Sequence, residues 1–92
     1  RRAFVLLASK DGRDGSIQVH QDVDLWVARV DAGERRERAV RPGRQAWVHV
    51  ARGSVSLNGT VLREGDGAAV SAEERLAFLG EREAEVLVFD LA

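Results

Sequence analysis

The chain has 92 residues and a mass of 10.1 kDa, which is enough for one small hydrophobic core and excludes several domains within it. Hydrophobic residues make up 45% and charged residues 32%, a balance typical of a folded globular domain and not of a disordered chain. Fourteen basic residues face fifteen acidic ones, and the net charge of −1 lacks the basic excess of a general nucleic-acid binder.

Two residue types are missing altogether. The absence of cysteine excludes a disulfide framework, a thiolate metal site and a cysteine nucleophile. The absence of methionine leads us to expect that the chain derives from a longer or processed product.

The first apolar run, residues 3–8, is far shorter than the ~20 residues that a transmembrane helix needs. Two arginines precede it, as in a signal peptide, but Ser9, Lys10 and Asp11 follow where small cleavage-site residues belong. We therefore interpret the run as a first strand, and we expect a cytoplasmic protein that does not partner with a membrane.

Turn residues divide the chain into short segments. Asp-Gly, Pro-Gly and Asn-Gly pairs recur between short runs, several of which alternate apolar and polar side chains as half-buried strands do. In chain order, strands are predicted at Phe4–Leu7, Ile17–His20, Leu25–Val30, Arg36–Val40, Ala46–Ala51, Ser54–Leu57, Thr60–Arg63, Ala68–Val70, Arg75–Leu79 and Glu85–Asp90.

Two of these segments involve a specific local prediction. Asn58-Gly59 lies between two strand-like runs and predicts a tight hairpin with a type I′ turn. Residues 71–78 open like a capped helix, but Gly80 would end that helix after barely two turns, so we favour the strand at Arg75–Leu79. Many short strands with glycine turns predict an all-β fold, an antiparallel β-barrel or a jelly-roll sandwich.

Several motifs follow one another in a specific order. They are Leu6–Gly12, His20–Trp26, Gly43–Val55, Leu57–Gly59, Leu62–Ser71 and Ala84–Leu91. This order resembles the carboxy-terminal cupin half of bacterial pirin-like bicupins over essentially the whole chain. The resemblance implies a cupin-type fold and a single cupin domain that spans residues 1–92.

The resemblance also implies a function. Members of this family carry two cupin barrels in tandem, and some are described as quercetin 2,3-dioxygenases with iron or another divalent metal in the amino-terminal barrel. The second barrel is generally metal-free. We therefore expect a metal-free domain with a structural role, which packs against an amino-terminal cupin domain or forms a homodimer. Two alternatives are a part of a metal-dependent dioxygenase and a barrel that binds a small ligand near Ala46, Ala68 and Ala69.

The cupin metal motifs can be checked against this sequence. The resemblance places the two histidines of the first motif near residues 39–42, its glutamate near Gln45 or Ala46, and the histidine of the second motif near Leu76. None of these residues is a metal ligand, so no cofactor is expected in this chain.

The two histidines of the sequence lie elsewhere. His20 and His49, with a carboxylate from Asp22 or Asp24, are the remaining candidates for a metal site. We favour a structural role for both, because His49 alternates with Val48 on its predicted strand and so faces away from the interior.

No catalytic residue is predicted. The sequence has no Gly-x-Ser-x-Gly motif, no tyrosine and no cysteine, and its Gly65-Asp66-Gly67 segment precedes a strand and not a phosphate-binding helix.

Candidate interface residues come from two groups, the large aromatic side chains with His49 and an arginine-rich segment. They are Trp26, Trp47, His49, Arg35, Arg36, Arg38 and Arg44, with Arg41 in the same segment. Tryptophan is enriched at interfaces, and arginine pairs with carboxylates and phosphates. The alternatives are a core or lid role for the tryptophans and a charged strand edge that blocks aggregation. A complementary acidic set could face the arginines across a boundary: Glu73, Glu74, Glu81, Glu83 and Glu85.

Overall fold

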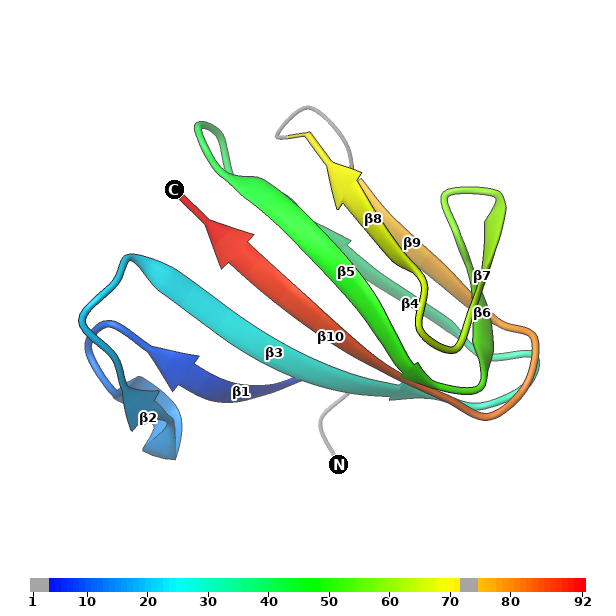
Figure 1. The fold of residues 1–92 in the computed structure, drawn as a ribbon, viewed down its shortest axis with the longest axis horizontal. Helices are drawn as coiled ribbons and strands as arrows, with labels where there is room; N and C mark the ends of the chain where they lie inside the picture. Colours follow the sequence, from blue (N-terminus) through cyan, green and yellow to red (C-terminus); the bar gives the residue numbers. More distant parts are fainter. Residues whose placement is uncertain (1–3, 72–74) are drawn as a thin grey trace.

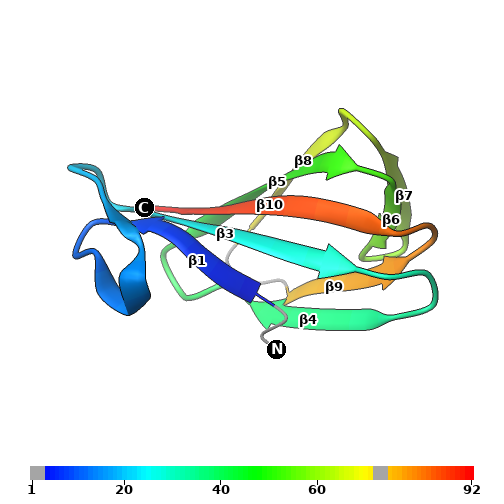
Figure 2. The ribbon, with the colours of Figure 1, turned by 90° about the horizontal axis from the view of Figure 1, so that it is seen from below.

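The computed structural model describes residues 4–71 and 75–92. Two sheets face each other, as Figure 1 and Figure 2 show from two directions. The strands are β1 (Phe4–Ser9), β2 (Ile17–Gln18), β3 (Val23–Val30), β4 (Arg35–Ala39), β5 (Gln45–Arg52), β6 (Ser54–Leu57), β7 (Thr60–Arg63), β8 (Gly67–Val70), β9 (Arg75–Gly80) and β10 (Ala84–Leu91), with a short 3-10 turn, η1, at Arg13–Gly15.

The larger sheet has six strands in the order β2-β1-β3-β10-β5-β8, and the smaller has four in the order β4-β9-β6-β7. The predicted all-β cupin-type fold is confirmed, and each predicted strand has a counterpart within a few residues. Over residues 4–71 and 75–92 the two sheets form an open jelly-roll sandwich and do not close into a barrel, because within these ranges β4 pairs only with β9 and β1 pairs only with β2 and β3.

Two further expectations need correction. The pair β1–β2 is parallel, not antiparallel, because the chain loops through η1 before Ile17 comes alongside Ala8. The strand predicted to reach His20 ends at Gln18, and the bend that follows turns the chain toward β3.

The local turn predictions hold. Asn58 and Gly59 both have positive φ, 49° and 86°, as a type I′ turn between β6 and β7 requires. Residues 75–80 form strand β9 and not a helix, while Ala72, Glu73 and Glu74 lie outside the described residues.

The core lies between the two sheets, where the inward side chains of both meet. Val48, Val50, Val86 and Val88 of the larger sheet are at most 1% exposed, and Phe78 from β9 is the largest fully buried side chain. This pattern follows from the period of two along each strand, which sends alternate side chains to the same face.

Glycines allow the two sheets to approach at one end of the sandwich. A Cβ at Gly80 would overlap the carbonyl oxygen of Asp31, and a Cβ at Gly53 would overlap the carbonyl oxygen of Glu83. Gly80 also donates its backbone N–H to the Glu34 carbonyl at 2.9 Å, and its own carbonyl accepts from Gly33 at 2.9 Å. The connections β3–β4, β5–β6 and β9–β10 all lie at this end, on the right in Figure 1.

No helix among the described residues has the length and apolar character needed to span a bilayer.

Candidate functional site: an outward apolar sheet face

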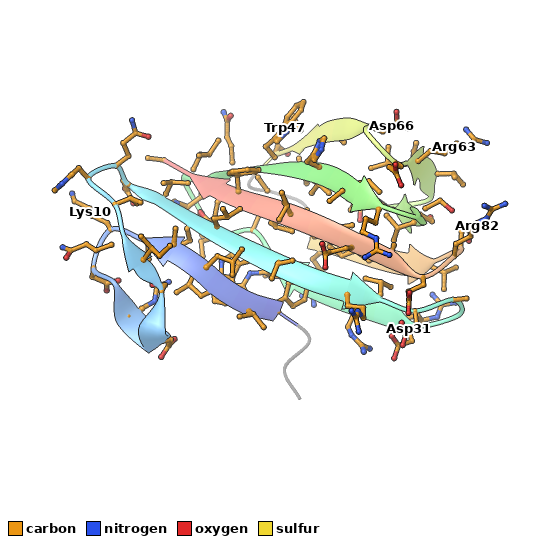
Figure 3. All side chains as sticks on the ribbon, turned by 60° about the horizontal axis from the view of Figure 1, so that its bottom comes forward. Lys10, Asp31, Trp47, Arg63, Asp66 and Arg82 are labelled. Atoms are coloured by element: carbon orange, nitrogen blue, oxygen red, sulfur yellow. The ribbon has the colours of Figure 1, made fainter. Side chains whose placement is uncertain are left out.

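The outer face of the six-stranded sheet carries apolar side chains where solvent would favour polar ones. Alternation places Val48 and Val88 inward, and it places Trp47, Leu87 and Phe89 outward on the same strands. Figure 3 looks onto this face and shows Trp47 projecting from it. A sheet with apolar residues on both faces is typical of one that is covered on both sides.

Strand register aligns these residues into rows that cross the sheet. One row runs through Val5, Val27, Leu87 and His49 on strands β1, β3, β10 and β5. Because directly opposite side chains lie within about 5.5 Å of one another, the three apolar residues of this row form a continuous strip.

The next row is more apolar still. It runs through Leu25, Phe89, Trp47 and Ala69 on strands β3, β10, β5 and β8. Trp47 is 43% exposed, although it is the largest side chain of the row. Together with Leu7 and Leu91, which are also exposed, the two rows form what we call the apolar face, defined by Val5, Leu7, Leu25, Val27, Trp47, His49, Ala69, Leu87, Phe89 and Leu91.

Charged residues border the apolar face at one end. Glu85 of β10 stands opposite Arg29 of β3 and opposite Arg52 of β5. An apolar centre with a charged margin is the usual composition of a protein interface, and contiguous exposed apolar patches of this kind mark interaction sites.

The predicted interface residues do not all lie on this face. Trp47 and His49 do, and the prediction that they point away from Val48 and Val50 is confirmed. Trp26 points inward, where it is partly buried against the core.

The arginines of the arginine-rich segment have different surroundings in the structure. Arg35 is exposed on β4. Arg36 binds Glu34 at 2.9 Å. Arg38 stacks on Trp26 with its guanidinium carbon 3.8 Å from the ring centroid.

Arg44 is nearly buried and forms part of an ion-pair network at the end of the sandwich away from Gly53 and Gly80. Its Nε donates to Asp90 Oδ1 at 2.6 Å, and its Nη1 lies 2.8 Å from Asp22 Oδ2. These carboxylates keep the pKa of Arg44 above its usual range, the Asp90 hydrogen bond contributing most. The hydrogen bond from Arg44 in turn lowers the pKa of Asp22 below its ordinary value.

Asp24 and Asp90 are the centre of this network. They stand opposite each other on β3 and β10 and face inward, where each is only 7% exposed. Arg13 donates two hydrogen bonds to the carboxylate of Asp24, at 2.7 and 3.3 Å. Arg41 bridges both carboxylates at 3.5 and 3.4 Å. Buried carboxylates require such partners because desolvation penalises an unpaired charge.

Sequence reasoning missed this network. Alternation does place Asp90 on the same face as Val86 and Val88, so a charged residue among buried valines was a signal that an arginine must meet it. The tertiary structure decides which arginine pairs with Asp90, since Arg44 is 46 residues away along the chain.

Of the positions implied for cupin metal ligands, three hold core side chains, while Ala39, Arg41, Pro42 and Gln45 are exposed. Val40, Ala46 and Leu76 are all buried within the main hydrophobic cluster. Among the described residues no three His, Asp or Glu side chains lie close enough together to hold a metal ion, and Asp22 and Asp24 are engaged by arginines. The donor set at these positions therefore does not fit a divalent metal.

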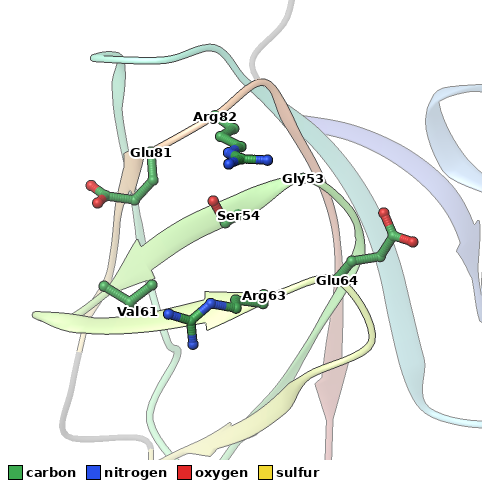
Figure 4. Close-up of a pocket in the computed structure, with 7 residues that line it drawn as sticks. All are labelled: Gly53, Ser54, Val61, Arg63, Glu64, Glu81 and Arg82. Carbon is green, nitrogen blue, oxygen red and sulfur yellow. The ribbon is translucent and has the colours of Figure 1, made fainter.

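A polar hollow of about 620 Å³ lies at the opposite sheet, on the outer side of β6 and β7. The side chains of Arg82 and Arg63 lie on either side of Ser54, while Glu81 and Glu64 point outward (Figure 4). Its lining residues include no histidine, so Ser54 has no imidazole base to activate it as a nucleophile there.

Comparison with known proteins gives a consistent result over nearly the whole chain. Residues 6–91 match the family model described as the quercetinase C-terminal cupin domain. A quercetin 2,3-dioxygenase of Escherichia coli (strain K12) is 35% identical over 86 residues, which cover 94% of this chain and 37% of that protein.

Two crystal structures of YhhW from Escherichia coli are similar in fold. One superposes with a TM-score of 0.94 at 33% identity and covers 100% of this chain and 39% of that one. The other, described as bacterial pirin YhhW in complex with nickel(II), has a TM-score of 0.92 at 33% identity and covers 98% of this chain and 39% of that one. This chain thus spans well under half the length of the relatives it matches.

Proposed function

The chain belongs to the family of quercetinase C-terminal cupin domains, and from this premise we propose that it is a metal-free packing domain whose apolar face binds a second cupin domain. The observation that carries the proposal is the apolar face itself, two aligned rows of apolar side chains on the outside of a sheet whose inside is already a packed core.

Burial of the apolar face would stabilise a complex with a partner domain. Burying a large apolar side chain contributes roughly 1.5–3 kcal/mol, and Trp47, Val5 and Leu7 are each left about two-fifths exposed in the single chain. A partner that covers the face would bury the remaining two-fifths of each of these side chains and so gain about that share of the contribution from each. Another sheet packed on the face would lie about 10 Å away.

A second cupin domain is the partner that best suits the comparisons. The matched relatives are longer than this chain, which spans 37% of the Escherichia coli quercetin 2,3-dioxygenase. The rest of such a protein is long enough to hold a further domain of this size. A cupin domain offers a sheet of matching width, whereas a single helix would cover only part of two rows that each cross four strands.

The metal-free role draws support from the interior. Val40, Ala46 and Leu76 occupy the places where cupin ligands are expected, and their side chains belong to the core. We further propose that any dioxygenase activity of a longer parent protein, with iron or another divalent metal, resides outside the matched segment.

One observation favours the alternative function, binding of a small ligand inside the barrel. A hollow of about 260 Å³ is lined by residues that include Leu62, Ala68 and Val70. The inward valines of β5 and β10 already fill the space between the sheets, however, as their near-zero exposure indicates. The packing role is therefore the stronger proposal.

Sedimentation velocity over a range of concentrations tests the proposal. The 92-residue chain alone should self-associate, because its apolar face has no partner, and Val5→Ser or Trp47→Ser should shift it toward monomer. Val61→Ser is the matched control, since Val61 is 44% exposed and Val5 is 43% exposed but Val61 lies on the other sheet. A wild-type chain that remains monomeric at high concentration would contradict the proposal.

A second experiment identifies the occupant. The part of the Escherichia coli quercetin 2,3-dioxygenase that lies outside the matched segment is added as a separate chain. We expect a one-to-one complex that replaces self-association and is weakened by Trp47→Ser. Self-association that persists unchanged in its presence would assign the face to a second copy of this chain instead.

A further inference from the structure

The polar hollow on the outer side of β6 and β7 brings two arginines from different elements to one place. Its volume of about 620 Å³ lies within the range of roughly 300–1,000 Å³ that small-molecule sites occupy. Arg63 of β7 and Arg82 of the β9–β10 connection both line it, and Figure 4 shows their side chains on either side of Ser54. The hollow lies on the smaller sheet and the apolar face on the larger one, so the inference is independent of the proposed function.

Backbone contacts to Ser54 determine where both arginines leave the main chain. Ser54 of β6 stands directly opposite Arg63 of β7, and side chains that stand opposite each other share one face of a sheet. The backbone N–H of Arg82 donates to the Ser54 carbonyl at 3.2 Å, and that of Glu81 donates to the same oxygen at 3.1 Å. The β9–β10 connection is thus held beside the pair that Ser54 forms with Arg63.

Neither guanidinium has an anion of its own within residues 4–71 and 75–92. Over these ranges Arg63 and Arg82 form no ion pair and donate no side-chain hydrogen bond, and the Ser54 hydroxyl has no hydrogen-bond partner. Arg75 of the same sheet differs, because it pairs with Glu37 at 3.1 Å. The hollow therefore offers two unpaired cations and a hydroxyl to a ligand.

Two carboxylates lie at the margin of the hollow and not between the arginines. Glu64 and Glu81 contribute to its lining, but their side chains point outward, away from Ser54 (Figure 4). Their charges oppose the binding of an anion from a distance, and solvent screens that repulsion because the groups are at the surface.

We propose that Arg63, Arg82 and the Ser54 hydroxyl bind the phosphoryl group of a small phosphate monoester. Such a group carries a charge of about −1.5 to −2 at pH 7 and three acceptor oxygens, which suits two guanidiniums and one hydroxyl. A carboxylate has only two oxygens in one plane, and a single guanidinium satisfies both. Val61 lines the same hollow and is 44% exposed, so it offers an apolar contact to the ester substituent.

Two-dimensional ¹H–¹⁵N NMR locates the binding site, because each backbone amide gives its own signal. Sodium phenyl phosphate is titrated at pH 7.5 against sodium chloride at equal ionic strength. We expect saturable shifts of the amides of Ser54, Arg63 and Arg82. Shifts confined to Val27 and Leu87 would place the phenyl ring on the apolar face and overturn the proposal, as would the absence of a saturable change.

Two further ligands separate the parts of the proposal. Benzoate carries the same ring on a carboxylate, and we expect it to bind at least about tenfold more weakly than phenyl phosphate, since it engages fewer donors. Benzoate that binds as tightly would overturn the assignment to a phosphoryl group. Inorganic phosphate lacks the substituent that contacts Val61 and should also bind more weakly. Equal affinity for inorganic phosphate would overturn the assignment to a monoester.

Arg63→Gln and Arg82→Gln should each weaken phenyl phosphate binding about tenfold, because each removes a charged donor. Arg75→Gln is the matched control, since it removes the same charge from the same sheet outside the hollow and should leave the affinity unchanged. The amide spectrum of each variant also shows that it is folded. Equal weakening in all three variants would reduce the effect to overall charge and overturn the site.

Glu81→Gln tests the role of the marginal carboxylates. It should tighten phenyl phosphate binding about twofold, because an exposed like charge is removed. Weaker binding in this variant would mean that the carboxylate takes part in holding the ligand, and would overturn the arrangement proposed here.

Discussion

The indole of Trp47 lies over Gly67 on the neighbouring strand β8, in the space that a side chain at position 67 would fill. A Cβ at Gly67 would overlap Cζ2 of that indole. The two residues are diagonal neighbours, since Trp47 stands opposite Ala69 and His49 opposite Gly67. The absence of a side chain at Gly67 therefore lets the indole of Trp47 pack against strand β8.

Gly67→Ala is expected to displace Trp47 from this position. Because the exposed indole can turn aside, the cost should stay below about 1 kcal/mol, but the tryptophan emission should move to longer wavelength as the indole turns toward solvent. In the Trp47→Ala background, Gly67→Ala should cost little, because the overlapping ring is gone. Equal effects of Gly67→Ala in both backgrounds, measured by chemical denaturation, would show that the contact does not matter.

Gly53→Ala should be strongly destabilising. Gly53 has a φ of 73°, and its Cβ would also overlap the Glu83 carbonyl oxygen. Gly43→Ala is the matched control, because Gly43 has a φ of 77° with nothing within 4 Å of the added Cβ. We expect roughly 1 kcal/mol for the control from backbone strain alone and clearly more for Gly53→Ala. Equal losses of unfolding free energy in the two variants would eliminate the close approach of Glu83 as a cause.

Asp90→Asn should weaken the fold by about 3 kcal/mol, since it removes the buried carboxylate that Arg44 and Arg41 share. Asp22→Asn removes the other partner of Arg44 but should have only a slight effect, because Asp22 is exposed and its ion pair is screened by solvent. Urea titrations of both variants give the unfolding free energy lost with each of the two carboxylate partners of Arg44. A smaller loss for Asp90→Asn than for Asp22→Asn would contradict this assignment of the network's centre.

The Arg44–Asp22 pair also predicts a pH dependence. The hydrogen bond from Arg44 keeps the folded-state pKa of Asp22 below its ordinary value of 3.8. Its contribution to stability is therefore fully present above that value and is lost as the pH falls through the lower, folded-state pKa. Unfolding free energies measured between pH 6 and about pH 2 should decline less steeply at the acid end in Asp22→Asn than in the wild type. Parallel curves for the two proteins would refute the linkage.

The purified chain should carry no stoichiometric iron, nickel, copper or zinc. The reason is the absence of ligand side chains at Val40, Ala46 and Leu76, which are core residues. Elemental analysis after dialysis checks this expectation. One bound metal per chain would contradict it, and His20→Ala and His49→Ala would then show whether either histidine holds the ion.

Much of the fold was predictable because strand alternation and turn chemistry are local. Asn58 and Gly59 adopt the positive φ values that their hairpin requires, and Val48 and Trp47 point to opposite faces as their spacing predicts. The parallel pairing of Ile17 with Ala8 was not predictable in this way, because it depends on where the η1 loop returns the chain.

The candidate site was predictable in part. The prediction that Trp47 and His49 face outward follows from two residues on one strand. The apolar face as a surface needs Phe89 and Leu25 beside Trp47, and those residues come from strands far apart in the sequence. The inward direction of Trp26 and its stacking under Arg38 could not be read from either residue alone.

By itself, then, the sequence determined most of the strands, the tight hairpin and the outward direction of Trp47 and His49, because all of these depend on residue type and on a spacing of a few residues. Only the tertiary structure decided which rows meet across the sheet, which arginine neutralises Asp90 and which donors remain unpaired. Those relationships depend on strand order and register between distant segments, which a period-two pattern leaves open.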